Sequence, residues 1–212
     1  MRFLKQLLVM ALAFSFGVNA QINTKDPAQL IQQVTTQTLN KIENQPELLK
    51  PESKELIKLI NIDLLPHVHY KFSSLKVMGI EARKTKPDER ERFYEAFKDY
   101  MVGTFALIFK EYKPKKQKLI VDPMRIKGQV PAKFVSEGKP DISIIFYLRE
   151  NTKTKDWQVW DIAAEGISQV ETKGKELRPL IRKHGLDYVT MQLRAKMQRG
   201  LTEEDLSGVK KP

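Results

Sequence analysis

The chain has 212 residues, a formal net charge of +11 at pH 7 and no cysteine. The absence of cysteine excludes a fold stabilised by disulfide bonds, a metal site with thiolate ligands and a lipid anchor attached through sulfur. Hydrophobic residues make up 41% and charged residues 30% of the chain, which is typical of a globular protein.

The first twenty residues have the layout of a secretory signal peptide. Arg2 and Lys5 precede an apolar run from Leu7 to Val18, and the predicted cleavage point follows Ala20. The run is shorter than the roughly 20 residues that a membrane-spanning helix needs. We therefore expect residues 1–20 to be removed, residues 21–200 to form one domain, and residues 201–212 to be a frayed basic tail.

Apolar residues at helical spacing predict helices through the first half of the mature chain. The first begins at Asp26-Pro27, with Asp as the N-cap and Pro at the first helical position. Further helices are predicted over about 52–64, 68–78 and 87–112. In the last of these, Phe93, Phe97 and Met101 fall within one arc of the helix surface, with charged residues opposite.

The pattern then changes to short segments rich in β-branched and aromatic residues. Residues 119–121, 132–135, 141–148 and 157–163 predict a four-stranded antiparallel meander. Both faces of the third strand are apolar, so we expect both to be covered, although an antiparallel sheet often keeps one face wet. Helices over about 168–183 and 186–199 complete a predicted α+β fold.

The sequence shows little that would support catalysis. It has no glycine-rich phosphate loop, no dinucleotide motif and no nucleophile elbow. The scattered histidines do not favour a metal site, and we expect no cofactor. Asp161 and Glu165 could act as an acid–base pair if one were buried, but a local cap and a turn are the favoured interpretation.

Lysines cluster at the end of the long helix, at Lys110, Lys113, Lys115 and Lys116. Cations at this position suit the helix dipole. They could face a lipid head group or a partner, or they could form an ordinary solvated loop, and the sequence leaves both interpretations open. Because the chain is predicted to be exported, its basic charge does not point to nucleic acid.

Several segments resemble the MlaC family in order and spacing, and together they cover about residues 26–200. The resemblance is carried by Leu64-Leu65-Pro66-His67-Val68, by Val77-Met78-Gly79, by Arg90, Phe93, Phe97 and Tyr100, by the run from Trp157 to Ser168, by Gly185-Leu186-Asp187, and by Gln192-Leu193.

The family consists of periplasmic phospholipid-binding proteins of the Mla lipid-transport system. The resemblance therefore implies an NTF2-like α+β fold, in which several helices pack on a four-stranded twisted antiparallel sheet and enclose an apolar pocket. It implies a phospholipid ligand with an exposed head group, a periplasmic location and no enzymatic activity. It also implies two partners: an outer-membrane lipoprotein–porin complex, and an inner-membrane ABC-transporter complex with its lipid-binding MCE protein. Moving lipid between them would maintain outer-membrane asymmetry.

Residues that share the helix arc or a strand face are predicted to wall the lipid slot, although an ordinary core is the alternative. They are Met78, Phe97, Met101, Phe105, Phe134, Ile144, Phe146, Trp160, Ile162 and Val170. We expect a monomer. Two other functions stay open: an NTF2-like enzyme that uses Asp161 as acid or base, and a basic periplasmic adaptor that holds no ligand.

Overall fold

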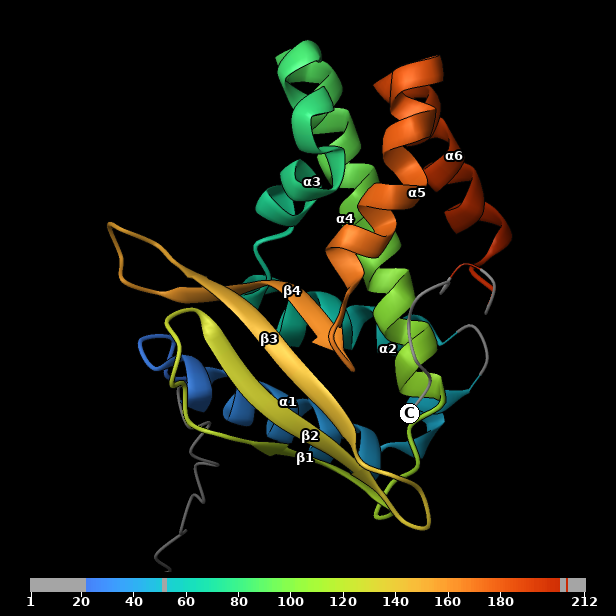
Figure 1. Ribbon diagram of the computed structural model, residues 1–212. Helices are drawn as coiled ribbons and strands as arrows, with labels where there is room; N and C mark the ends of the chain where they lie inside the picture. The colour runs from blue at the N-terminus through green and yellow to red at the C-terminus, as the bar shows by residue number, and fades with distance from the viewer. Residues whose placement is uncertain (1–21, 51–52, 203–204, 206–212) are drawn as a thin grey trace, which may run out of the picture.

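The computed structural model describes residues 22–50, 53–202 and 205 of the chain. The predicted signal peptide therefore lies outside the described residues, as does most of the predicted tail. Figure 1 shows a sheet with α1 along one side of it and with α3, α4, α5 and α6 gathered beyond its β4 end. None of the described helices has the length and apolar composition needed to cross a bilayer.

The helices of the first half follow the predicted order. Helix α1 (Pro27–Asn44) starts where expected, because the Asp26 carboxylate accepts hydrogen bonds from the backbone N–H groups of Ala28 and Gln29. The predicted helix over 52–64 divides into α2 (Lys54–Leu59) and a π-helical turn η2 (Ile60–Leu64). A 3-10 turn, η1 (Pro46–Leu49), precedes it, and another, η3 (Leu65–His67), follows it. Then come α3 (Tyr70–Met78), η4 (Gly79–Lys84) and the long α4 (Pro87–Lys110).

The sheet is antiparallel throughout, with the order β1-β2-β3-β4-β5. Its strands are β1 (Gln117–Val121), β2 (Gln129–Ser136), β3 (Ile142–Glu150), β4 (Trp157–Ala164) and β5 (Ile167–Ser168). The prediction of four strands is thus one short, because the two residues of β5 are too few to show an alternating pattern. Helices α5 (Gln169–His184) and α6 (Leu186–Arg199) end the fold.

Strand β2 is longer than predicted because it continues through a proline. The carbonyl of Pro131 accepts a hydrogen bond from the N–H of Asp122, just beyond the end of β1. The N–H and C=O of one residue in an antiparallel strand point to the same neighbour, so the missing N–H of Pro131 also lies on that side. Pairing of Pro131 with Ile145 in β3 is therefore preserved.

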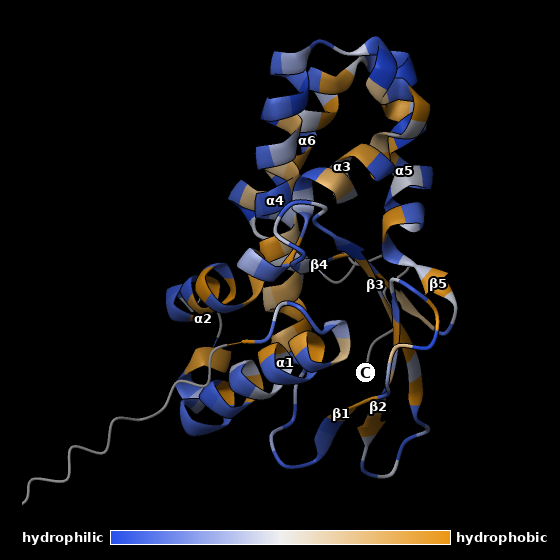
Figure 2. Ribbon diagram, turned by 90° about the vertical axis from the view of Figure 1, so that its left-hand side faces the viewer, coloured by the Kyte–Doolittle hydropathy of each residue, from blue (hydrophilic) through white to orange (hydrophobic). Residues whose placement is uncertain are grey.

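Cross-strand pairing defines two faces of the sheet. We call the inner face the one that carries Leu119, Ala132, Ile144, Phe146 and Ile162, since paired residues point the same way. Leu30, Ile31 and Val34 of α1 pack on it in one core cluster with Phe146. Figure 2 shows α1 and strands β1 and β2 as two layers when seen from the side.

The opposite, outer face is covered only in part. Helices α3 and α5 contact β4 there, whereas Lys118 and Lys133 on β1 and β2 are exposed. The prediction concerned the third strand, β3: its inner face is covered at Phe146, whereas Ile145 and Tyr147 on its outer face are half-buried. A second core cluster joins α3, α4, α5 and α6 through residues such as Phe93, and a third joins α2 to α4.

The start of the predicted tail does not behave as frayed chain. Leu201 packs against the cluster of α4 and α6, and the Tyr100 hydroxyl donates a hydrogen bond to the Asp205 carbonyl at 2.6 Å. The Asp205 carboxylate, which is only 5% exposed, also pairs with Lys196 and Arg199. These ion pairs could not be foreseen from a segment without periodicity.

The backbone conformation of Gly128, the residue just before β2, can be tested by substitution. Its φ is +77°, and a Cβ atom added there would lie 2.8 Å from the Leu148 carbonyl oxygen. Gly138 has a similar φ of +72° but nothing within 4 Å. We expect Gly138→Ala to lower the free energy of unfolding by about 1–2 kcal/mol and Gly128→Ala by clearly more, because only the latter adds a clash with backbone. Equal losses in denaturant titrations would contradict this account.

Candidate functional site

The residues predicted to wall a slot do not all lie together. Met78, Phe97, Phe146 and Val170 are buried within the core clusters. The other predicted residues are half-buried and lie at the edges of these clusters: Met101, Phe105, Phe134, Ile144, Trp160 and Ile162. A large apolar side chain in partial contact with water forgoes about 25 cal/mol for each Å² of apolar surface that stays exposed.

All of these half-buried residues except Trp160, together with Leu64, form what we call the apolar seam. Met101 packs against the cluster of α3 to α6, Ile144 and Ile162 pack against the α1 cluster, and Phe105 and Phe134 pack against the α2–α4 cluster. The seam residues thus border all three clusters, and their side chains come from α4, from the inner face of the sheet and, for Leu64, from η2 (Ile60–Leu64).

Leu64 is the seam residue that the sequence prediction missed. It packs against both the α1 cluster and the α2–α4 cluster. It ends the π-helical turn Ile60–Leu64, a rare conformation that occurs frequently at functional sites. The Leu64-Leu65-Pro66 segment carries part of the family resemblance, and this resemblance is the signal in the sequence that points to Leu64.

Trp160 was expected on the same face as Ile162, and this expectation is wrong. The pairing of β3 with β4 shifts register between Tyr147 and Leu148, which leaves Trp160 as the extra residue of a β-bulge. Its ring packs against Phe72 of α3 and against Tyr147 on the outer face. A hydrogen bond joins α3 to the bulge: the Ser73 hydroxyl donates to the Trp160 carbonyl at 2.6 Å.

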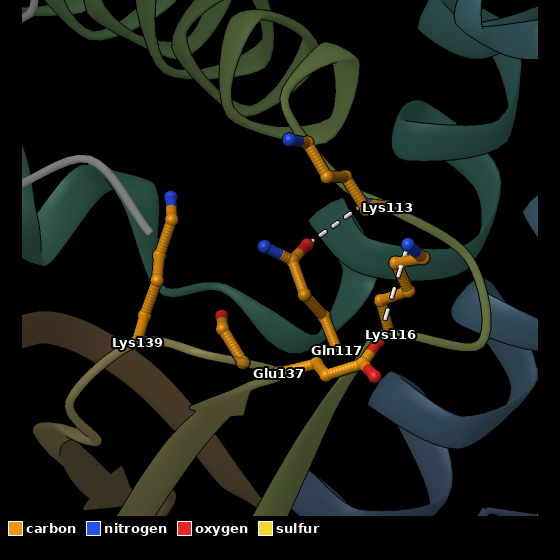
Figure 3. Close-up of a pocket in the computed structure, with 6 residues that line it drawn as sticks. Lys113, Lys116, Gln117, Glu137 and Lys139 are labelled. Carbon is orange, nitrogen blue, oxygen red and sulfur yellow. Dashed lines mark hydrogen bonds and ion pairs between the residues drawn. The ribbon is translucent and has the colours of Figure 1, made fainter.

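Only two of the four predicted basic residues line a common hollow. Lys113 and Lys116 line a hollow of about 270 Å³, together with Gln117, Ser136, Glu137 and Lys139 (Figure 3). Lys110 lies in the last turn of α4, and the N–H of Lys115 is directed at the carboxylate of Glu43 at 3.5 Å. Lys139 was missed because it follows the next strand, and only the pairing of Gln117 with Ser136 brings the two strand ends together.

Asp161 has the geometry of a structural cap. It is buried, which raises the pKa of its carboxyl group. Its oxygens accept hydrogen bonds from the Ser168 hydroxyl at 2.5 Å and from the N–H groups of Ile162 and Val170 at 2.8 and 3.0 Å. Glu165, at a φ of +51°, forms the turn that follows. The favoured interpretation of this pair, a cap and a turn, is confirmed.

The described residues also show no arrangement that suits a metal ion. Across residues 22–50, 53–202 and 205, no three histidine, aspartate or glutamate side chains come together in a way that could hold one.

Comparison with known proteins gives this geometry a context. The family model for MlaC protein matches residues 32–195. The intermembrane phospholipid transport system binding protein MlaC of Haemophilus influenzae is 24% identical over 192 residues, which cover 88% of this chain and 89% of that protein. The phospholipid-binding protein from Ralstonia solanacearum, solved in complex with a phospholipid, is similar in fold with a TM-score of 0.72 and 17% identity. That match covers 82% of this chain and 98% of the other.

The fold and the site together define a mixed domain in which helices pack on an antiparallel sheet around an apolar seam. The family match extends over well more than half of the sequence, from the middle of α1 into α6. The chain belongs to the MlaC family.

The role of Asp161 as a cap can be tested by stability. Asp161→Ala leaves the buried N–H of Val170 and the Ser168 hydroxyl without their acceptor, so we expect the free energy of unfolding to fall by about 2–4 kcal/mol. Asp161→Asn keeps one acceptor oxygen and should lose less. Chemical denaturation measures both variants, and an Asp161→Ala protein as stable as the wild type would exclude the capping role.

His69 predicts a pH dependence of stability. Its Nδ1 accepts the N–H of Phe72 at 3.3 Å and so caps α3, and burial together with the nearby Arg149 lowers its pKa below 6.5. The unfolded chain then takes up the proton first, so the free energy of unfolding should fall as the pH drops below about 6.5.

His69→Asn supplies an N-cap acceptor that does not titrate. We expect a shallower dependence on pH in thermal or chemical unfolding, with a remainder from His67, whose pKa burial also lowers. An unchanged slope in the variant would show that His69 does not contribute.

Proposed function

We propose that this protein is a periplasmic carrier that holds the acyl chains of a phospholipid along the apolar seam. The single observation that carries the proposal is a set of half-buried, large apolar side chains on α4 and the inner face, in a chain of the MlaC family. The Haemophilus influenzae relative, a binding protein of an intermembrane phospholipid transport system, supports it.

The physical need for a carrier follows from the cost of exposing acyl chains to water. Two chains with roughly 30 methylenes, at about 0.8 kcal/mol each, cost on the order of 25 kcal/mol in water. A carrier has to offer an environment about as apolar as the bilayer, since every additional 1.4 kcal/mol makes release tenfold less favourable. The flexible Met101 and the rings of Phe105 and Phe134 suit chains of varied length.

The seam is the part of the interior best suited to open. Each adjoining cluster keeps its own fully buried residues, such as Leu30 in the α1 cluster and Ile60 in the α2–α4 cluster. Parting the clusters along Leu64, Phe134 and Ile162 would separate half-buried side chains and leave those buried contacts in place. A lipid lying there would re-cover the apolar surface, as the pocket of an NTF2-like fold would.

In this proposal the carrier moves lipid between an outer-membrane lipoprotein–porin complex and an inner-membrane ABC-transporter complex with its lipid-binding MCE protein. The sequence has no ATP-binding motif, so any direction of transport comes from the partners. We propose that the protein acts as a monomer and helps to maintain outer-membrane lipid asymmetry. The structural role of Asp161 speaks against the enzymatic alternative.

A pair of matched substitutions tests the seam. Ile162 faces the seam, whereas Ile120 lies on the outer face of β1 and is 43% exposed. Native mass spectrometry of protein taken from the periplasm should show phospholipid-sized adducts on the wild type and on Ile120→Glu. We expect Ile162→Glu to lose them, because a buried charge against an acyl chain is strongly unfavourable.

Unfolding measurements on both variants provide the control for folding. Phe146→Glu is a poorer test, because Phe146 is buried in the core and its variant could lose lipid by unfolding. A folded Ile162→Glu protein that still carries normal lipid would remove Ile162 from the site. Wild-type protein without any lipid would overturn the proposed function.

A further inference from the structure

Helix α1 buries a hydroxyl group that has no hydrogen-bond partner. Thr38 is fully buried, with 0% of the residue exposed, and its Oγ1 atom is unpaired among the described residues. A buried polar group without a partner lowers the stability of a fold, so native structures contain few of them. The presence of one on α1 therefore needs a physical reason.

Other helical hydroxyls in the same structure show the usual arrangement. A Ser or Thr hydroxyl within a helix commonly donates to the backbone carbonyl four residues earlier. Ser74 and Thr190, which are buried to a similar degree, do so at 2.8 and 2.9 Å. Thr35, on α1 itself, does so at 2.6 Å. Thr38 makes no such bond, so its hydroxyl is left available to a group from outside the helix.

Ser136 carries a second unpaired hydroxyl. It is 7% exposed, and its Oγ atom has no partner in the part of the chain that the structure describes. Ser136 ends β2 and pairs with Gln117, so its side chain shares the inner face with Phe134 of the apolar seam. Two residues along a strand span about 7 Å, which places the Ser136 hydroxyl close to the seam. The next residue, Glu137, is exposed, so Ser136 lies at the solvent end of the inner face.

Thr38 lies beside the clusters that border the seam. Val34, one turn earlier on the buried face of α1, belongs to the α1 cluster, and Ile42, one turn later, belongs to the α2–α4 cluster. Leu64 of the seam packs against both of these clusters, and Phe134 packs against the second. Both unpaired hydroxyls therefore border the part of the interior in which the proposed function places the acyl chains.

The chemistry of a lone hydroxyl among apolar side chains selects its partner. A buried water molecule needs about two to four polar partners, and Thr38 offers it one side-chain hydroxyl between Val34 and Ile42. A carbonyl oxygen is satisfied by a single donor. The ester carbonyls are the polar atoms of a phospholipid that adjoin its acyl chains, so they accompany the chains into an apolar site. A contact between a hydroxyl and an ester joins two neutral groups and needs no charge nearby.

We propose that the hydroxyls of Thr38 and Ser136 donate hydrogen bonds to the ester carbonyls of the bound phospholipid. The inference rests on the proposed function and adds a chemical preference to it. A lipid with ester-linked chains satisfies both hydroxyls, whereas a lipid with ether-linked chains fills the same space and leaves them unpaired.

The first arm of the test measures the binding of two soluble phosphatidylcholines by calorimetry: the dihexanoyl diester and the dihexyl diether, which share head group and chain length. The wild type should bind the diester about tenfold more tightly. Thr38→Val, which keeps nearly the same shape, and Ser136→Ala should each reduce this preference, and the double variant should lose it. Thr35→Val removes a hydroxyl that is already paired on the same helix and should keep the preference.

The second arm separates a ligand-binding hydroxyl from a structural one. Because Oγ1 of Thr38 is unpaired in the protein alone, Thr38→Val should leave the free energy of unfolding unchanged or raise it. Thr35→Val removes a hydrogen bond of 2.6 Å and should not raise it. A Thr38→Val protein that is less stable than the wild type and keeps the diester preference would show a structural hydroxyl and overturn the proposal.

The third arm observes the ester groups directly. Isotope-labelled ester carbonyls give a separate infrared band, and the frequency of this band falls when the oxygen accepts a hydrogen bond. In the wild-type complex the band should lie below its position in an apolar solvent, and the double variant should return it toward that position. A wild-type band at the apolar-solvent position would overturn the proposal.

The failures of the two proposals are distinguishable. Equal binding of diester and diether, or a diester preference that the double variant keeps, overturns the ester contacts and leaves the carrier function standing. Binding of neither lipid by the wild type overturns the carrier function, and the ester contacts with it.

Discussion

A sheet that is apolar on both sides at β3 and β4 has to be covered twice, and the rest of the structure depends on this constraint. Helix α1 covers the inner face, and α3 and α5 cover the outer face over β4. The two coverings belong to different core clusters, with a further cluster between α2 and α4. The residues of the apolar seam pack at the edges of these clusters.

The bulge in β4 allows one strand to serve both coverings. Without it, Trp160 would share a face with Ile162, and α3 would lose the ring that packs against Phe72. Just beyond the bulge, Asp161 joins the strand to the start of α5 through Val170 and Ser168. The donors that surround this carboxylate offset part of the cost of its burial.

The helices and strands could be predicted to a large extent, because periodicity and caps are local properties. Asp26 predicted the start of α1, and the spacing along α4 predicted its length. Predictions failed where a signal was short or interrupted: the two-residue β5, the continuation of β2 through Pro131, and the π-helical turn that ends at Leu64. The slot prediction combined core and boundary residues, since helix arc and strand face alone do not distinguish them.

The sequence by itself determined the α+β class, the order of the elements, the resemblance to the MlaC family and the local role of Asp161, because each depends on neighbours along the chain. Only the tertiary structure decided which face Trp160 occupies and which apolar residues are half-buried. It also decided that Ser136 and Lys139 join Lys113 in one hollow. These features depend on strand register and on packing between distant segments, and a one-dimensional pattern does not encode either.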